Sequence, residues 1–503
     1  MKPFRFKVIG RIAAARIADA LAASWVVRTA APSGVHRCHL DTFDWALWRS
    51  GGRLTLETEA GQTLARWERD ARVRRAPVPR DVRFAGDLPR AFSNEVADAT
   101  EGRALLPVGE ALVRRRELRI IDGEGKTRAR VWFDTVRPLR DGEWTGQRLR
   151  LVVVEPLPGY ARDAEAVAAR LGAEPALAAA RDEELEAAAA ACGRRPGDYT
   201  SKLAVPLRAT EPAERAVRRI LRHLAATIAA NVDGTVRDLD TEFLHDLRVA
   251  TRRTRTCLGQ LDGVFPHAHV EAFAAEFRWL ADATNPLRDL DVFLAELAPH
   301  AAGPLAPLVG RVRAVRADAH IELSSVLGSE RFDRLMRRWR RVLDRRLPGG
   351  ERGAEPVAAL AAERMWRAYR RLSSHARDLT ADCPPAELHR LRIDAKKLRY
   401  LLEFFASLWD PEETKALVAE LKLVQDSLGN YHDAFLQGER LTALAPEVLA
   451  SGAGAATLLA MGRLVADLER RQVAEAERVL ARLEAFAAPP FPDRFAHLVE
   501  RIG

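Results

Sequence analysis

The segment "LHDLRVATRRTRTCL" at residues 244–258 gathers one histidine and four arginines. An ideal α-helix turns about 100° per residue, so residues three, four and seven positions apart share one side. On such a helix, four basic residues fall within an arc of about 80°: His245, Arg248, Arg252 and Arg255. Arg253 lies to one side and Leu247 borders the arc. The segment therefore predicts a helix whose cationic stripe adjoins the protein core.

The same pattern recurs 144 residues later, at residues 388–402, as "LHRLRIDAKKLRYLL". Its stripe consists of His389, Arg392, Lys396 and Arg399, with Lys397 to the side. A second pair of segments, "FRWLADATNPLRD" at 277–289 and "LKLVQDSLGNYHD" at 421–433, is separated by the same 144 residues. Two matching pairs without a gap between them predict a duplicated helical unit, whose equivalent faces meet about a pseudo-two-fold axis.

The chain changes character near its middle. Residues 205–503 place apolar side chains at three- and four-residue steps, which predicts an all-α domain of roughly eight to ten helices. Its two copies extend over about 205–348 and 349–503. Residues 166–204 form a helical segment and a linker with the stretch "CGRRPGDYTSK". Residues 1–165 alternate polar and apolar residues, as in "RLTLETE", which predicts an antiparallel β domain and an α+β chain.

The composition favours a polyanionic partner. The 503 residues include 79 Lys and Arg against 70 Asp and Glu, for a net charge of +9. Phosphate polymers, nucleic acids and acidic membrane surfaces are partners of this kind. The four cysteines form no C-x-x-C pair, so neither a zinc site nor a disulfide framework is indicated. No uncharged run approaches the roughly 20 residues of a membrane span. We therefore expect a soluble, cytoplasmic protein without a membrane partner, and its alanine and arginine content is typical of a GC-rich bacterial genome.

The two stripes resemble the motifs of the CHAD family, the conserved histidine α-helical domains. The first reads H-x-x-R-V-x-x-R-R-x-R and the second H-x-x-R-x-x-x-K-K-x-R-Y. The segments "LRDLDVF" at 287–293 and "LGNYHD" at 428–433 resemble later motifs of that family. The resemblance covers roughly residues 205–500. It implies two pseudo-symmetric four-helix bundles with a central basic surface that binds inorganic polyphosphate, and association with polyphosphate granules is a further expectation.

The resemblance also implies which residues contact the polymer. The stripe positions are His245, Arg248, Arg252, Arg255, His389, Arg392, Lys396 and Arg399. Flanking positions add Arg253, Arg278, Arg288, Lys397 and Lys422. Arginine donates forked hydrogen bonds to phosphate oxygens, and lysine supplies a point charge. Histidines with the ordinary pKa of about 6.5 would gain charge on acidification, so binding is expected to tighten at low pH and to weaken in salt.

A solvated charged face is the alternative interpretation of the stripes. Like charges four residues apart destabilise a helix by a few tenths of a kcal/mol per pair. Arg248 and Arg252 form such a pair, and so do Arg392 and Lys396. Solvated faces usually mix signs for this reason, and the repetition of the pattern favours a polyanion-binding surface.

The first 165 residues resemble the CYTH, or triphosphate-tunnel, family, which implies a β-barrel or tunnel. The matching stretches are "LDTFDWALWRSGGRLTLE" at 40–57 and "ELRIIDGEGKTRARVWFDTV" at 117–136. That family opens with E-x-E-x-K, but here Pro3 and Arg5 replace both metal-binding glutamates and only Lys7 remains. A hydrolytic site needs Mg²⁺ or Mn²⁺ held by carboxylates. We therefore expect a scaffold without catalytic residues, cofactor or metal, and a metal-dependent inorganic triphosphatase with a CHAD accessory domain is the alternative.

Two further signals admit more than one interpretation. The segment "MRRWRRVLDRR" at 336–346 interleaves Trp339 with arginines, a pattern found in nucleic-acid binders. We interpret it as an amphipathic helix with Trp339, Leu335 and Val342 inward and the arginines in solvent. Nucleic-acid binding is thus an alternative to polyphosphate binding. For Asp433 we expect a helix-capping role.

Overall fold

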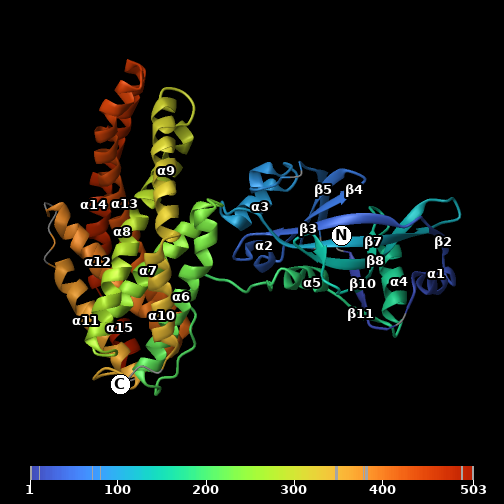
Figure 1. Cartoon of the computed structure of the whole chain (residues 1–503), viewed down its shortest axis with the longest axis horizontal. Coiled ribbons are helices and arrows are strands. Elements are labelled where there is room, and N and C mark those ends of the chain that lie inside the picture. The colour runs from blue at the N-terminus through green and yellow to red at the C-terminus, as the bar shows by residue number, and fades with distance from the viewer. Residues whose placement is uncertain are drawn as a thin grey trace. The chain divides into compact units, whose positions relative to one another are not determined.

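The computed structural model describes residues 3–500 except residues 11, 71, 80, 346–348, 378, 380–382, 489 and 490. The chain divides into two compact units, residues 1–200 and 201–503. Figure 1 shows that the first is built around a β-sheet and the second from helices. The predicted α+β class, with an antiparallel β domain before an all-helical region, is confirmed.

The first unit holds one sheet, in which the described strands pair antiparallel. The strands are β1 (Phe4–Val8), β2 (Val26–Thr29), β3 (Ser33–Asp41), β4 (Arg53–Glu59), β5 (Gln62–Arg69), β6 (Arg72–Pro77), β7 (Leu106–Ile121), β8 (Thr127–Arg140), β9 (Glu143–Trp144), β10 (Leu149–Pro156) and β11 (Leu177–Ala179). Their order is β11-β1-β10-β8-β7-β3-β4-β5-β6, while β2 pairs with β7 and β9 with β8.

This sheet is strongly curved. Strands β1 and β5 are six places apart in the order, which would separate them by about 29 Å in a flat sheet. Instead, Arg5 Nη2 of β1 lies 2.6 Å from Glu68 Oε1 of β5. Arg75 of β6 and Glu155 of β10, also six strands apart, are 2.8 Å apart. The sheet therefore curls until its two halves face each other across a polar interior.

Helices pack on both faces of this curved sheet. Helices α1 (Ala14–Ala22) and α4 (Ala161–Gly172) pack their apolar faces onto β7, β8 and β10. The other helices of the unit are α2 (Ala46–Arg49), η1 (Ala85–Asp87), α3 (Ser93–Thr100) and α5 (Glu183–Ala191). Helix α5 lies directly on β7 at Gly109, where a Cβ atom would come within 2.6 Å of the Ala188 carbonyl carbon. A glycine is therefore required for this close approach.

The second unit contains α-helices throughout its described residues. They are α6 (Ala213–Val236), α7 (Thr241–Gln260), α8 (His267–Leu297), α9 (Ala306–Leu327), α10 (Glu330–Asp344), α11 (Val357–Arg377), α12 (Pro385–Phe405), α13 (Pro411–Ala450), α14 (Ala455–Ala487) and α15 (Phe491–Glu500). Short 3₁₀ turns follow α8 and α12, at Ala298–His300 and Ala406–Leu408. Helices α13 and α14 are long and run side by side (Figure 1). None of the described helices is long and apolar enough to cross a membrane.

The duplication is visible in where the helices begin. Helices α11, α12 and α13 start 144 residues after α6, α7 and α8, respectively. One apolar core contains residues of all six of these helices. A second core joins the later parts of α8 and α13 with α9 and α14. The two stripe helices are thus anchored in a common core, because their leucines recur at helical spacing.

A glycine allows α6 to meet the start of α7. The Asp240 carboxylate caps α7 by accepting hydrogen bonds from the backbone N–H groups of Glu242 and Phe243, at 2.9 and 3.3 Å. The Phe243 ring is 1% exposed. A Cβ atom at Gly234 of α6 would lie 2.1 Å from that ring. The cap and the glycine together determine where the first cationic stripe begins.

We predict that Gly234→Ala destabilises the helical unit by about 1–3 kcal/mol, because the added methyl group overpacks a buried aromatic contact. The matched control is Gly310→Ala in α9, where a Cβ atom would meet nothing within 4 Å. This control should stabilise the protein by up to about 1 kcal/mol through helix propensity. Urea denaturation of both full-length variants, followed by circular dichroism, measures the difference. Equal stabilisation by the two substitutions would contradict the packing argument.

Candidate functional site

The structure brings cationic side chains of α7 and α12 together. The Arg252 Nε atom of α7 donates a hydrogen bond to the Tyr400 hydroxyl of α12 at 2.5 Å. Arg252 is also close enough to lower the pKa of Lys396. We call the resulting group the central basic surface, and it consists of His245, Arg248, Arg252, His389, Arg392 and Lys396. Residues of both sequence repeats therefore contribute to one site.

Tyr400 organises the arginines at this crossing. Its side chain is 1% exposed, and the guanidinium carbons of Arg252, Arg253 and Arg399 lie 5.7, 5.8 and 5.5 Å from its ring centroid. A cation near an aromatic face is stabilised by roughly 0.5–1 kcal/mol at exposed sites. One aromatic ring thus offsets part of the repulsion among three cations. The sequence pattern did not indicate this role, although the tyrosine directly follows Arg399 in the second stripe.

Lys396 is the most perturbed amine of the site. Burial, together with the neighbouring Arg392 and Arg252, lowers the pKa of Lys396 to about 7. The amine makes no hydrogen bond or ion pair with any other residue that the structure describes. The pKa of Arg392 is also lowered, first by burial. This part of the surface therefore holds crowded, partly desolvated cations that an anionic ligand would stabilise.

His245 differs from the expectation for a binding histidine. Burial and the nearby Arg288 lower the pKa of His245 to about 4. Burial and Arg392 have the same effect on His432, whose ring centroid lies 5.1 Å from that of His389. His245 is therefore neutral near pH 7, and its protonation does not strengthen binding in the physiological range. Burial and, to a lesser degree, neighbouring cations account for the difference, and neither follows from the sequence pattern.

Arg248 is held in place by neutral partners. Its Nη1 atom donates hydrogen bonds to Thr284 Oγ1 and Asn285 Oδ1 of α8, at 3.1 and 2.6 Å. Burial lowers the pKa of Arg248 to about 10, which leaves it cationic at neutral pH. Neutral partners orient the guanidinium without cancelling its charge, so it remains attractive to an anion.

Other predicted residues already have carboxylate partners. The pairs are Arg253–Glu403, Arg399–Glu403, Lys397–Asp394, Arg288–Glu242 and Arg392–Asp433, with N–O distances of 2.5, 3.3, 3.3, 3.9 and 3.6 Å. Because Glu403 contacts two arginines, that end of the site carries less net positive charge than the end at Lys396. Asp433 lies within α13 and faces Arg392, so the predicted capping role of Asp433 is wrong.

The remaining predicted residues are less closely connected. Arg255 is half-buried and makes no ion pair with any described side chain. Arg278 and Lys422 are exposed, and no contact in the described part of the chain joins them to the central basic surface.

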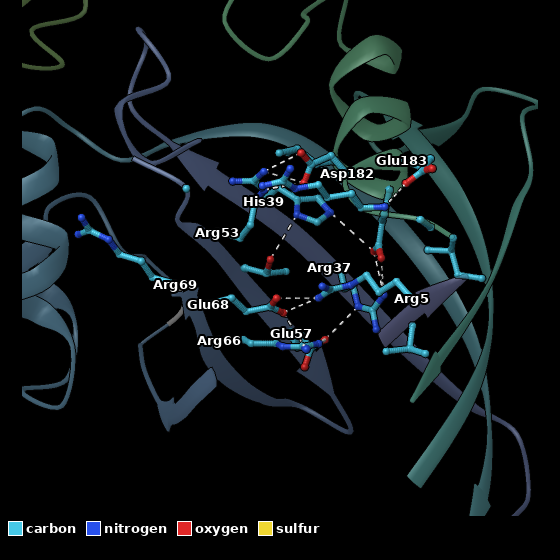
Figure 2. A pocket seen from close by; sticks show the side chains of 18 of the residues that line it. Arg5, Arg37, His39, Arg53, Glu57, Arg66, Glu68, Arg69, Asp182 and Glu183 are labelled. Carbon is cyan, nitrogen blue, oxygen red and sulfur yellow. Dashed lines mark hydrogen bonds and ion pairs between the residues drawn. The ribbon is translucent and has the colours of Figure 1, made fainter. Parts of the chain in front are cut away.

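The first unit contains a polar pocket, which Figure 2 shows from close by. Arg5, at the position of an expected metal-binding glutamate, donates two hydrogen bonds to Glu68, at 2.6 and 2.8 Å. Arg37 has three carboxylate partners: Glu57, Asp134 and Glu184, at 3.0, 2.8 and 2.8 Å. Near the mouth, Arg53 Nη2 lies 2.6 Å from Asp182 Oδ1. These arginines and carboxylates are therefore paired with one another inside the pocket.

The carboxylates of this pocket do not fit a divalent metal. Burial would raise the pKa of Glu68, but Arg66 and Arg5 hold it below its ordinary value. Glu155, at the end of β10, is occupied by Arg75 at 2.8 Å. No group of three or more His, Cys, Asp or Glu side chains among the described residues could hold a metal ion. Guanidinium groups thus neutralise the acids that a Mg²⁺ or Mn²⁺ site would need.

The comparisons with known proteins concern mainly the helical unit. Residues 219–442 match the family model of the CHAD domain. The uncharacterized protein Rv2226 of Mycobacterium tuberculosis is 28% identical over 318 residues, which cover 58% of this chain and 59% of that protein. The chain thus matches less than two thirds of the length of this relative.

Two solved structures are also similar. The crystal structure of the CHAD domain from the plant Ricinus communis is 28% identical and covers 57% of this chain and 98% of that chain, with a TM-score of 0.49. PptA from Streptomyces chartreusis is 19% identical and covers 55% of this chain and 99% of that chain, with a TM-score of 0.42. On the strength of the family match, the helical unit of this chain contains a CHAD domain at residues 219–442.

Proposed function

We propose that the helical unit binds inorganic polyphosphate on the central basic surface without chemical turnover. One observation carries this proposal: Arg252 of α7 meets Tyr400 of α12, which brings it near Arg392 and Lys396, and burial together with these two arginines lowers the pKa of the lysine. Such repulsion is unfavourable in the free protein and is relieved when an anion binds. A linear phosphate chain presents repeated charged oxygens, so one ligand satisfies cations from both repeats at once.

Nucleic acid fits this surface less well. Proteins that bind single strands usually offer exposed aromatic rings on which bases stack. The ring at the centre of this surface, Tyr400, is 1% exposed and is surrounded by arginines. Reading a duplex sequence requires side chains that reach base edges, whereas Arg248 is already engaged by Thr284 and Asn285. The surface has the features of a phosphate binder without those of a base reader.

For the first unit we propose a scaffold role, as a degenerate CYTH-like domain. The arginine–carboxylate pairs of its pocket stand where a triphosphatase would need free acids and a metal. We also propose that the protein is cytoplasmic and associates with polyphosphate granules. In this arrangement the helical unit alone would contact the polymer.

We predict that Arg252→Gln combined with Arg392→Gln weakens binding of long-chain polyphosphate on the order of a hundredfold, because two charge-assisted contacts are lost. The logarithmic dependence of the binding constant on salt should also become shallower by about 1.5 to 2. Titration calorimetry at two salt concentrations measures both effects. The matched control is Arg313→Gln with Arg463→Gln, two exposed arginines that make no ion pair with a described residue. If both double variants bind alike, the central basic surface is not the site.

We predict that polyphosphate binding tightens as the pH falls through about 7, because Lys396 gains its proton there. The variant Lys396→Arg stays charged, so its affinity should be nearly constant between about pH 6 and pH 8.5. Lys396→Gln should bind more weakly and also lose the pH dependence. The same pH profile in wild type and Lys396→Arg would show that another group controls the titration. His245 does not account for a change in this window, since its pKa is about 4.

We predict that the full-length protein releases no phosphate from tripolyphosphate in Mg²⁺ or Mn²⁺ above the level of the Lys7→Ala variant. Arg5 occupies Glu68, and the other acids of the pocket are paired, so metal binding would have to break buried ion pairs. A phosphate-release assay measures the rate. Metal-dependent turnover that Lys7→Ala abolishes would establish the triphosphatase alternative.

A further inference from the structure

Helix α10 carries a separate face of arginines, which we call the α10 arginine face. It consists of Arg334, Arg337, Arg338 and Arg341, and all four are exposed. On an ideal helix they share an arc of about 100°. The opposite side contains the buried Trp339 and Leu335 and the half-buried Val342, as the sequence pattern predicted. The helix is therefore anchored by its apolar side and presents its cations to the exterior.

The charges of this face are poorly compensated. The side chains of Arg337, Arg338 and Arg341 make no hydrogen bond or ion pair with the described residues, although Arg338 lies 5.8 Å from the Phe273 ring centroid. Arg334 has only a distant partner, Glu330 at 3.7 Å, in an exposed pair of the kind that contributes little. Like charges three and four residues apart destabilise a helix slightly. Packing of Trp339 against Phe273 offsets this repulsion, with ring centroids 4.6 Å apart.

This face is distinct from the central basic surface. The preceding turn of α10 contacts α8 through Arg331, which pairs with Glu276 at 3.0 Å and lies over the Trp279 ring. The central basic surface contacts α8 through Asn285, which accepts a hydrogen bond from Arg248. Asn285 follows Glu276 by nine residues, which corresponds to about 13 Å along the helix axis. The two basic surfaces therefore contact α8 at separate points along its length.

The chemistry of the α10 arginine face favours a phosphate polymer. Trp339, the aromatic residue among these arginines, is 2% exposed, so it offers no ring for stacking of bases. The apolar side of the helix is used by the core, which leaves no hydrophobic face to enter a lipid surface. Guanidinium groups on successive turns match a linear array of phosphates through forked hydrogen bonds.

We propose that the α10 arginine face binds a second stretch of the same polyphosphate chain, or a second chain. This inference rests on the proposed function, since it takes the same ligand. Two separate faces make the helical unit bivalent, so that long polymers bind more tightly than one face allows and are cross-linked by the protein. A ligand as short as tripolyphosphate occupies the central basic surface alone.

The test uses full-length protein and the triple variant Arg334→Gln, Arg338→Gln and Arg341→Gln. For long-chain polyphosphate, the logarithmic salt dependence should become shallower by about 2 to 3. Light scattering from mixtures of protein and long chains should fall well below that of wild type, because the variant binds the chains without cross-linking them. Affinity for tripolyphosphate should remain that of wild type. The matched control replaces Arg313, Arg463 and Arg471 with glutamine, since these exposed arginines also lack a described ion pair.

The outcomes separate the two proposals. If the α10 variant and the control behave alike with long chains, the α10 arginine face has no role in binding and the inference is wrong. If the Arg252→Gln, Arg392→Gln variant keeps wild-type affinity for tripolyphosphate, the proposed function of the central basic surface fails instead. Loss of duplex DNA binding in the α10 variant, with polyphosphate binding intact, would overturn the choice of ligand. A wild type that binds no polyphosphate overturns both.

Discussion

The candidate site depends on the crossing of α7 and α12, where the Arg252 guanidinium donates to the Tyr400 hydroxyl. This contact holds cations from two distant parts of the sequence at short range despite their repulsion. The apolar core beneath supplies the necessary free energy, since Leu247 of α7 and Leu398 of α12 are both fully buried in it. A rigid apolar support allows an unfavourable charge arrangement to persist in the free protein.

The two halves of this site are not electrostatically equivalent. The second repeat contributes Tyr400 and Glu403, where the first has Thr256 and Gly259. Glu403 compensates Arg253 and Arg399, whereas Lys396 has no comparable partner among the described residues. Among the described residues, Lys396 and Arg252 are therefore cations of this surface without an ion-pair partner. The two copies of the duplicated unit therefore differ in charge, because these equivalent positions carry different residues.

In the pocket of the first unit, by contrast, cations lie next to carboxylates. There the sheet curls so that Arg5 and Glu68 meet at 2.6 Å, and Arg37 is surrounded by carboxylates. Burial raises the pKa of Asp134 to about 7, although Arg37 opposes this effect. Buried ion pairs of this kind are retained when both partners are present, because removal of one leaves an unpaired charge. The charges of the pocket residues neutralise one another, whereas the central basic surface keeps a net positive charge that attracts anions.

The sequence by itself determined the α+β class, the helical character of the second unit and the stripes on its repeated helices. These features follow from local periodicity, which fixes the side of a helix or strand on which each residue lies. Tertiary structure alone decided that Arg252 meets Tyr400, that Arg278 and Lys422 lie outside the cluster, and that His245 stays neutral. Each of these depends on residues far apart in the chain, because pKa values and ion pairs respond to distance and burial in space. The periodicity of the sequence determines on which side of a helix or strand each residue lies. Only the packing of these elements determines how far apart their residues are.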